Sequence, residues 1–303
     1  MNPAFSRRAF LASTLPTATV LSLSTASQAA PARQPSPRSS SRFLIDTNIS
    51  LGQWPLRRLP ADEPDRLIAK LRQHHVTQAW AGSFEGLLHK DLASVNARLA
   101  QTCRDHGRGM LLPFGSVNPL APDWEEELRR CAELHRMPGI RLHPNYHGYR
   151  LDHPAFAQLL NAASQRGLLV QLALVMEDER MMHPLLRVEP VDTAPLASIV
   201  RNNPGLRIQL INALRTLRAK PLLSLIATGQ VFVEISMLEG VGGLDQILRQ
   251  IPADRIAFGS HAPLFYFEAS MLKLQESDLT PAQLTAIRNQ TAQQHLLPAP
   301  AKP

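Results

Sequence analysis

The sequence predicts an α/β fold, a (β/α)₈ TIM barrel, over residues 42–297. Short apolar runs alternate eight times with amphipathic stretches in this range, as expected where every strand carries its own helix. Several runs are apolar on both faces, which is typical of parallel strands covered by helices. A doubly wound sheet is the alternative fold. However, no glycine-rich phosphate loop follows the first run, where a nucleotide-binding sheet usually carries one.

The expected strands are the apolar runs that end at polar or turn-forming residues. Their ranges are Phe43–Ile49, Thr77–Gly82, Met110–Val117, Gly139–His143, Leu168–Val175, Arg207–Asn212, Gln230–Ser236 and Arg255–Gly259. The fifth and sixth show the both-faced pattern best, because an extended chain points successive side chains to opposite faces. Eight such runs in series favour the closed barrel.

Helices are expected between these strands, and the segment after Asp152 shows the strongest pattern. Pro154 suits the first turn of a helix, and apolar residues recur at helical spacing from Phe156 to Ala163, ending near Gly167. The segment therefore predicts an amphipathic helix that packs on the barrel.

Other helices are indicated by their starting residues. A helix over residues 65–74 would bury its leucine and isoleucine side chains. Asp123 with Glu126 three residues later, and Thr280 with Gln283, both have the spacing of a capping box. We expect a helix to begin at each pair.

The first thirty residues resemble an export signal. Ser6–Leu11 contains paired arginines in a twin-arginine signature, and an apolar stretch, Ala9–Leu23, follows. Ser27–Ala29 offers small residues where a signal peptidase would cleave. A membrane anchor is the alternative, but the stretch is short for a spanning helix and Pro16 interrupts it.

The predicted domain organisation follows from these features and from composition. We expect a twin-arginine signal peptide at residues 1–29, a disordered Pro/Ser/Arg-rich linker at 30–41, the barrel at 42–297 and a tail at 298–303. No second apolar segment reaches membrane-spanning length. The protein is therefore expected in the periplasm or secreted, without a membrane anchor after cleavage.

Charge and cysteine content narrow the classes of partner. The net charge is +7, but the basic residues are scattered and do not form a stripe interleaved with aromatic residues, which argues against nucleic-acid binding. A small-molecule substrate is the expected partner, and the sequence is compatible with a homo-oligomer. Cys103 and Cys131 lie on expected helices among apolar neighbours. Buried free thiols are favoured there over a disulfide.

Four segments resemble the amidohydrolase-2 family of TIM-barrel, metal-dependent hydrolases. Leu44–Gly52 is similar to the family's first strand, in which Ile-Asp leads into His-x-His, and Gly139–Pro144 to its fourth. Arg255–Pro263 resembles the eighth strand, which reads Gly-Ser-Asp-x-Pro in the family, and Ile287–Leu296 the terminal helix. The order and spacing of the segments imply the family's barrel over the whole range.

The positions that hold the metal in this family are occupied here by other residues. The His-x-His pair corresponds to Asn48 and Ser50, the strand-five histidine to Ala173, the strand-six histidine to Asn212, and the aspartate to His261. Asparagine and serine are poor zinc ligands, and a metal site needs several convergent His, Cys or carboxylate groups. We expect no cofactor at the standard site. A non-standard divalent metal held by His143, His147 and His261 with a nearby carboxylate is a variant left open.

The candidate site lies at the carboxyl ends of the strands, where these barrels carry their chemistry. His143 and His261 end strands four and eight and are the candidate catalytic acid and base. The candidate substrate-binding residues are Asn48, Arg141, Asn145, Tyr146, His147, Asn212 and Glu234. If both histidines and Asn48 end parallel strands of one barrel, they should share a pocket.

Structural roles compete with several of these assignments. Arg141 and Glu234 are as compatible with an ion pair inside the barrel, and His143 with a strand terminator. The run Glu177–Glu179 resembles a solvated loop face, and Trp54 a core plug. Each alternative makes a contact that the structure can show.

Three functions fit the sequence. The first is an exported hydrolase that acts on a small carboxylate, amide or ester with histidine acid–base chemistry. The second is a non-catalytic small-molecule binding barrel, and the third is a decarboxylase, since such enzymes occur within the family. The hydrolase is favoured mainly by the resemblance, because a fold alone does not define a function.

Overall fold

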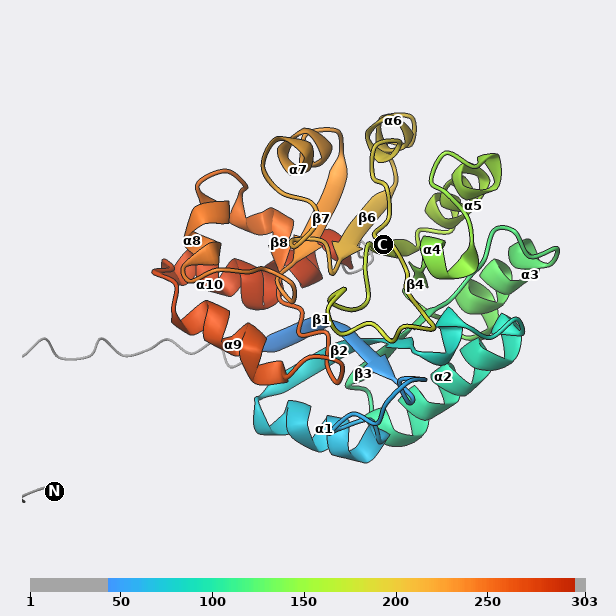
Figure 1. Cartoon of the computed structure of the whole chain (residues 1–303), viewed down its shortest axis with the longest axis horizontal. Coiled ribbons are helices and arrows are strands. Elements are labelled where there is room, and N and C mark those ends of the chain that lie inside the picture. Colours follow the sequence, from blue (N-terminus) through green and yellow to red (C-terminus); the bar gives the residue numbers. More distant parts are fainter. Residues whose placement is uncertain (1–42, 298–303) are drawn as a thin grey trace, which may run out of the picture. The chain divides into compact units, whose positions relative to one another are not determined.

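The computed structural model describes residues 43–297, apart from the side chain of Lys220. Eight parallel strands in sequential order form a barrel, and the helices surround it (Figure 1). The strands are β1 (Leu44–Leu51), β2 (Val76–Ser83), β3 (Leu111–Gly115), β4 (Gly139–Leu142), β5 (Leu169–Ala173), β6 (Arg207–Ile211), β7 (Gln230–Glu234) and β8 (Ile256–Ala257). Main-chain contacts between β1 and the chain after β8 close the ring, including a parallel bridge from Ile49 to Ala262. The predicted TIM barrel is confirmed.

The strands differ from their expected bounds mainly at the carboxyl ends. Most stop one or two residues early, because the chain turns out of the hydrogen-bonded ladder there. Asn212 and His261 follow β6 and β8 with φ of 56° and 57°, a left-handed conformation that ends a strand. The residues expected to end strands therefore lie on tight turns above the barrel.

Helices lie between the strands as expected, including those predicted over residues 65–74 and after Asp152. They are α1 (Pro64–Gln73), α2 (Leu92–Gly107), α3 (Trp124–Arg129), α4 (Pro144–His147), α5 (Pro154–Gln165), α6 (Leu196–Arg201), α7 (Ala219–Ile226), α8 (Gly243–Leu248), α9 (Phe267–Gln275) and α10 (Pro281–Thr285). The 3₁₀ helices are η1 (Glu85–Leu87) and η3 (Ala253–Arg255), and the π-helices are η2 (Arg130–Leu134) and η4 (Ala286–Leu296). The predicted capping box at Thr280 is present. The one at Asp123 is wrong, because that side chain makes no capping hydrogen bond.

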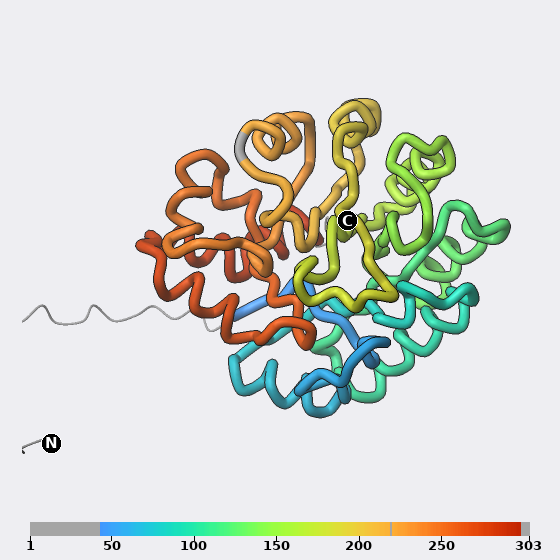
Figure 2. The backbone as a smooth tube through the Cα atoms, viewed as in Figure 1, coloured from blue at the N-terminus to red at the C-terminus, as the bar shows by residue number. Residues whose placement is uncertain are grey.

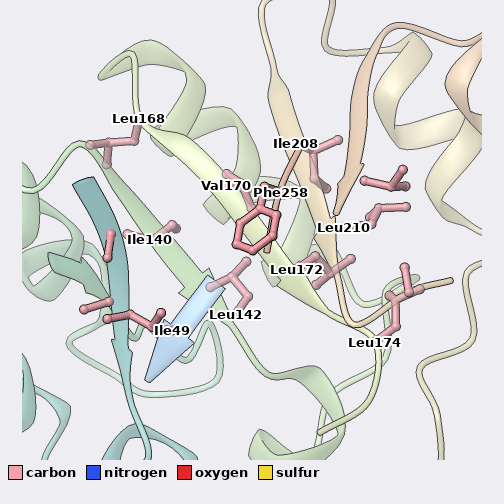
Figure 3. Packing of buried hydrophobic residues seen from close by; sticks show 14 of the residues in the cluster. Ile49, Ile140, Leu142, Leu168, Val170, Leu172, Leu174, Ile208, Leu210 and Phe258 are labelled. Atoms are coloured by element: carbon pink, nitrogen blue, oxygen red, sulfur yellow. The ribbon is translucent and has the colours of Figure 1, made fainter. Parts of the chain in front are cut away.

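The largest apolar core lies between the strands and the surrounding helices. Figure 3 shows side chains of β4, β5 and β6 in this core, including Leu142, Val170 and Leu210. They alternate along the strands with residues that point into the barrel. Cys103 and Cys131 are buried free thiols, as expected.

A second apolar group fills the amino-terminal end of the barrel interior. This floor cluster consists of Ile45, Trp80, Phe114, Leu169, Phe232, Ala257, Ala292 and Leu296. Trp80 and Phe114 are fully buried and stack with ring centroids 5.3 Å apart. The barrel is therefore a packed core at this end, and any site must lie at the other.

The predicted signal peptide, linker and tail lie outside the described residues. Within residues 43–297, no helix is long and apolar enough to cross a membrane.

Candidate functional site

A belt of hydrogen-bonded polar side chains crosses the barrel interior above the floor cluster. Arg141 donates to Gln171, Gln171 to Gln209, and Gln209 to Thr47, at 2.7–2.8 Å. These residues come from four strands, and all are buried. The belt marks the change from an apolar floor to a polar mouth.

Arg141 lies within this belt and is almost completely buried. Its guanidinium donates to the main-chain oxygens of Ile49 and Trp80, at 2.7 and 3.1 Å. Gly82 leaves the space that it needs, because a Cβ there would lie 2.6 Å from Nη1 of Arg141. Burial lowers the pKa of Arg141 to about 9. The proposed ion pair with Glu234 does not form within residues 43–297, so Arg141 is a positive charge held beneath the mouth.

Glu234 lies at the end of β7 and is the centre of a second network. Its carboxylate accepts hydrogen bonds from the main-chain nitrogens of Asn212 and Ser236, both at 2.6 Å, and from the Ser236 hydroxyl. Nδ2 of Asn48 lies 3.3 Å from the carboxylate and donates to Oδ1 of Asn212 at 2.7 Å. Gly259 leaves room for the carboxylate, since a Cβ there would lie 2.3 Å from it. Among residues 43–297, Oδ1 of Asn48 has no hydrogen-bond partner, although it is buried.

Asp46, near the start of β1, contacts the turn that follows β8. It accepts hydrogen bonds from the hydroxyl and main-chain nitrogen of Ser260, at 2.5 and 3.0 Å, and from the main-chain nitrogen of Asn48. Burial raises the pKa of Asp46 to about 7. Its contacts make it a positioning residue that fixes the turn leading to His261.

His261 follows this turn and is 1% exposed. Its main-chain nitrogen donates to the oxygen of Asn48 at 2.7 Å, so the two predicted site residues are neighbours. Nε2 lies 2.8 Å from the main-chain oxygen of Met176. A carbonyl only accepts, so Nε2 carries the proton and Nδ1 keeps its lone pair. Nδ1 is buried and has no partner in the described part of the chain, and burial lowers the pKa of His261 to about 4.

His143 reaches the same interior from the end of β4. It is 2% exposed, and its buried Nδ1 also has no hydrogen-bond partner among the residues that the structure describes. Burial lowers its pKa well below the usual value, with smaller contributions from His147, Arg141 and His261. His143 follows β4 and His261 follows β8, so both lie at the carboxyl end of the barrel. A strand terminator held by its imidazole would have a hydrogen bond at the ring nitrogens. Nδ1 of His143 makes none within residues 43–297.

His147 and Tyr146 lie on α4, beside His143. The rings of His143 and His147 are edge to face, with centroids 6.0 Å apart. Nε2 of His147 donates to the main-chain oxygen of Gly86 at 2.7 Å, which leaves its Nδ1 unprotonated and without a partner. Tyr146 is partly buried against the apolar cap above the site.

This apolar cap closes the mouth of the barrel. It consists of Trp54, Leu59, Phe84, Leu87, Ala173, Met176, Ile211 and Leu264. Trp54 packs edge to face on Phe84 with centroids 5.2 Å apart, so its interpretation as a plug is confirmed. Ala173 also lies in this cap. The resemblance to the amidohydrolase-2 family implies that Ala173 takes the place of the family's strand-five metal ligand.

The chain between β5 and α6, residues 174–195, contributes to the closure. Figure 2 shows this yellow-green segment passing over the centre of the ring of helices. Asn212 donates to the main-chain oxygen of Val175 at 2.8 Å, and His261 to that of Met176. Two predicted site residues therefore hold the segment that covers them.

Ion pairs hold the acidic part of this mouth segment. Glu177 is 3% exposed and pairs with Arg57, while Asp178 pairs with Arg215 at 2.5 Å. Glu179 alone is strongly exposed. The interpretation of this run as a solvated loop face is therefore wrong for its first two residues. They anchor the segment over the mouth.

The residues present do not form a suitable set of metal ligands. No group of three or more His, Cys, Asp or Glu side chains within residues 43–297 is arranged to hold a metal ion. Nδ2 of Asn48 is directed at Asn212 and Glu234, and Ser50 lies near the Arg141 guanidinium. The variant in which His143, His147 and His261 share a metal therefore does not fit this arrangement.

Fold and site together define a TIM barrel with a polar, covered carboxyl end. A sequence profile described as amidohydrolase matches residues 45–296. The chain therefore belongs to the amidohydrolase family. No curated protein matches the sequence significantly.

Solved structures with the same fold include several decarboxylases. A 5-carboxyvanillate decarboxylase from Novosphingobium aromaticivorans, solved with manganese, has a TM-score of 0.66 and 13% identity, covering 84% of this chain and 98% of its own. A 2,6-dihydroxybenzoate decarboxylase from Rhizobium has a TM-score of 0.63 and 15% identity, with coverages of 82% and 96%. A dihydroxybenzoic acid decarboxylase from Polaromonas, also with manganese, has a TM-score of 0.61 and 14% identity, with the same coverages. At these identities the likeness shows the fold alone.

Some residues that shape the site were not identified from the sequence. Met176 acts through its main-chain oxygen, which no side-chain pattern reveals. Gly82 and Gly259 make room for the two buried charges, and a glycine inside a predicted strand is a signal of such close approach. Gln171 and Gln209, polar residues within otherwise apolar strands, could have indicated the belt.

Proposed function

We propose that this protein carries out acid–base chemistry on a small carboxylate, amide or ester without a resident metal ion. His143 and His261 are the proposed proton-transferring residues. The observation that carries the proposal is the pair of buried imidazoles, each with Nδ1 unpartnered, at the end of the barrel where this fold carries its chemistry. Unpartnered buried nitrogens are costly, and they are expected where a ligand or water completes them.

The state of His261 suits it to act as a base. Its tautomer is fixed by Met176, so Nδ1 presents a lone pair, and its lowered pKa keeps the ring neutral. A pKa near 4 is low for a base that works at neutral pH. A bound anion would raise it by favouring the imidazolium. A substrate carboxylate beside the two rings would therefore activate the residues that act on it.

The surrounding residues would hold such a substrate in place. Oδ1 of Asn48 is a free acceptor for a substrate hydroxyl or N–H. Asn212 and Glu234 fix the Asn48 amide, and the buried charge of Arg141 beneath them favours an anion. A bound substrate carboxylate would favour protonation of His143, whose pKa burial holds well below its usual value. In hydrolysis, Nδ1 of His261 would then take a proton from the attacking water, and the His143 imidazolium formed on binding would donate one to the leaving group.

The test is turnover of a panel of small carboxylates, amides and esters by chelator-treated protein. We expect His261→Gln to lower kcat at least about 100-fold, the usual range for a lost acid or base. Glutamine can still donate to Met176, so folding should be retained. His89→Gln, which changes an exposed histidine, is the matched control. Activity that requires added manganese or survives His261→Gln would overturn the proposal.

Two other functions lead to different results in the same experiment. Decarboxylation is the second candidate, because several solved structures of this fold are decarboxylases, and it would release CO₂ from the carboxylates of the panel. A non-catalytic binding barrel is favoured by the covered mouth, and it would bind panel compounds without converting them. Binding without turnover would therefore select the binding barrel over both enzymes.

A further inference from the structure

An open cavity of about 430 Å³ lies between the turn after β4 and the end of the mouth segment. A much smaller space of about 10 Å³, enough for at most about one water molecule, is lined by His143 and Met176. The two share four lining residues, Asn145, Val188, Glu189 and Val191. The large cavity and the covered histidine are therefore separated only by this shared wall.

Two hydrogen bonds hold the shared wall in place. On its buried side, the main-chain nitrogen of Val191 donates to the main-chain oxygen of Leu174 at 2.9 Å. Nδ2 of Asn145 donates to the main-chain oxygen of Glu189 and so ties α4 to the mouth segment. Both residues are at least partly exposed, unlike the buried contacts at Glu177 and Met176. The Asn145–Glu189 contact is therefore the more exposed of the two hydrogen bonds of the wall, and an exposed hydrogen bond contributes little stability.

The lining of the large cavity indicates what it binds. Leu151, Val191 and Pro195 give it apolar walls. Tyr149 also lines it, and the buried hydroxyl of Tyr149 has no hydrogen-bond partner within the described residues. Arg187, at the same cavity, forms no ion pair within residues 43–297. Glu189 and Asp192 also line the cavity. These groups together suit a small molecule with an apolar body and one or two polar ends.

We propose that this cavity is the antechamber of the histidine site, and that substrate passes from it to His143 when Asn145 and Glu189 separate. The inference rests on the proposed function for the identity of the destination. It adds the binding chamber, the entry route and the gating residue Asn145. Asn145, a candidate substrate-binding residue in the sequence analysis, is thereby assigned to the entry gate and not to contact with the reacting group.

A second cavity offers a competing route and so makes the inference testable. It measures about 490 Å³ and is lined by Leu120, Ala121, Tyr146 and His147, but His143 is not part of its lining. The hydrogen bond from His147 to Gly86 fixes one of its walls. Filling either cavity separately should show which one leads to His143.

The experiment measures the rate at which diethyl pyrocarbonate modifies His143 in the full-length protein, resolved by peptide mass spectrometry. Exposed His153 is the internal reference. We expect Asn145→Ala to raise the His143 rate several-fold by opening the wall, and Val188→Trp to lower it several-fold by filling the wall. Ala121→Trp, which fills the second cavity, should leave the rate unchanged.

Thermal unfolding of each variant shows whether it is folded. If Val188→Trp does not fold, Asn145→Ala still decides, because an unchanged His143 rate in that variant overturns the inference. Slowing by Ala121→Trp would assign entry to the second cavity instead. The reagent needs no turnover, so the route can stand even if His143→Gln leaves catalysis intact and the acid–base proposal fails.

Discussion

The two ends of the barrel interior differ in the polarity of their buried side chains. The floor cluster is apolar, and its members are buried against one another. The mouth holds charged and amide side chains at equal burial, and several of its ring nitrogens and oxygens have no partner. The same eight strands supply both ends, so the difference lies in the residues that point inward near each strand's beginning and end.

This contrast separates what stabilises the barrel from what it does. Apolar burial is satisfied as soon as the side chains pack, whereas a buried polar atom without a partner costs free energy. Within the described residues, three such atoms lie at the carboxyl end of the barrel, on Asn48, His143 and His261, and each lowers the free energy of unfolding. Functional sites are where such costs are usually retained.

The largest effect is expected from removing a ring from the floor. Phe114→Ala should lower the free energy of unfolding by about 3–5 kcal/mol, because it leaves a cavity among rigid strands and removes the stack on Trp80. Phe84→Ala is the matched change in the cap and removes an equally buried ring. It should cost less, because nearby loops can settle into the space. Chemical denaturation measures both, and a cap variant that loses as much as the floor variant would contradict the contrast.

An intermediate effect is expected at the carboxylate network of the mouth. Glu234→Gln places an amide among donors from Asn48, Asn212 and Ser236, so at least one N–H loses its acceptor. We expect a loss of about 1–3 kcal/mol in the free energy of unfolding.

Glu127→Gln is the control for this change. Glu127 is also buried, but it lies outside the barrel interior and accepts a hydrogen bond from Nδ2 of Asn96. Urea unfolding should show a smaller loss for Glu127→Gln than for Glu234→Gln. Equal losses would mean that Glu234 is an ordinary buried acid and not the centre of a network.

The floor was easier to predict from the sequence than the mouth. Runs such as Leu168–Val175 reveal a parallel strand because burial on both faces leaves a local pattern. The neighbouring positions of Asn48 and His261 followed from barrel closure alone. The pairing of Glu177 with Arg57 could not be predicted, since it joins two loops whose paths depend on the completed fold.

The strand ends show the same limit on a smaller scale. Asn212 was expected inside a strand, yet it follows β6 with positive φ, because its main-chain nitrogen turns toward the Glu234 carboxylate. The sequence identified the residue but not its conformation. The polar network of the mouth, unlike apolar packing, depends on distances between specific atoms, and no periodicity encodes these.

The smallest effect expected is in the pH dependence of stability, and it isolates the cost of the buried imidazole. The pKa of His261 is lowered from 6.5 to about 4 in the folded protein. Between these values the unfolded chain binds a proton that the folded chain does not, so stability is lost as pH falls from 6.5 toward 4. His143 acts in the same direction, whereas Asp46, whose pKa is raised to about 7, acts in the opposite one.

Comparison of the wild type with His261→Gln removes the contributions that the two proteins share. Glutamine keeps a donor for Met176 but cannot be protonated in this range, so the variant should gain stability relative to wild type on acidification. The relative gain should approach about 1 kcal/mol per pH unit, below the limit of about 1.4 kcal/mol set by one proton. Urea unfolding at pH 7, 6 and 5 measures it. Parallel pH profiles would show that His261 is protonated equally in both states, and the mouth would then lack the dry, neutral imidazole that distinguishes it from a solvated histidine.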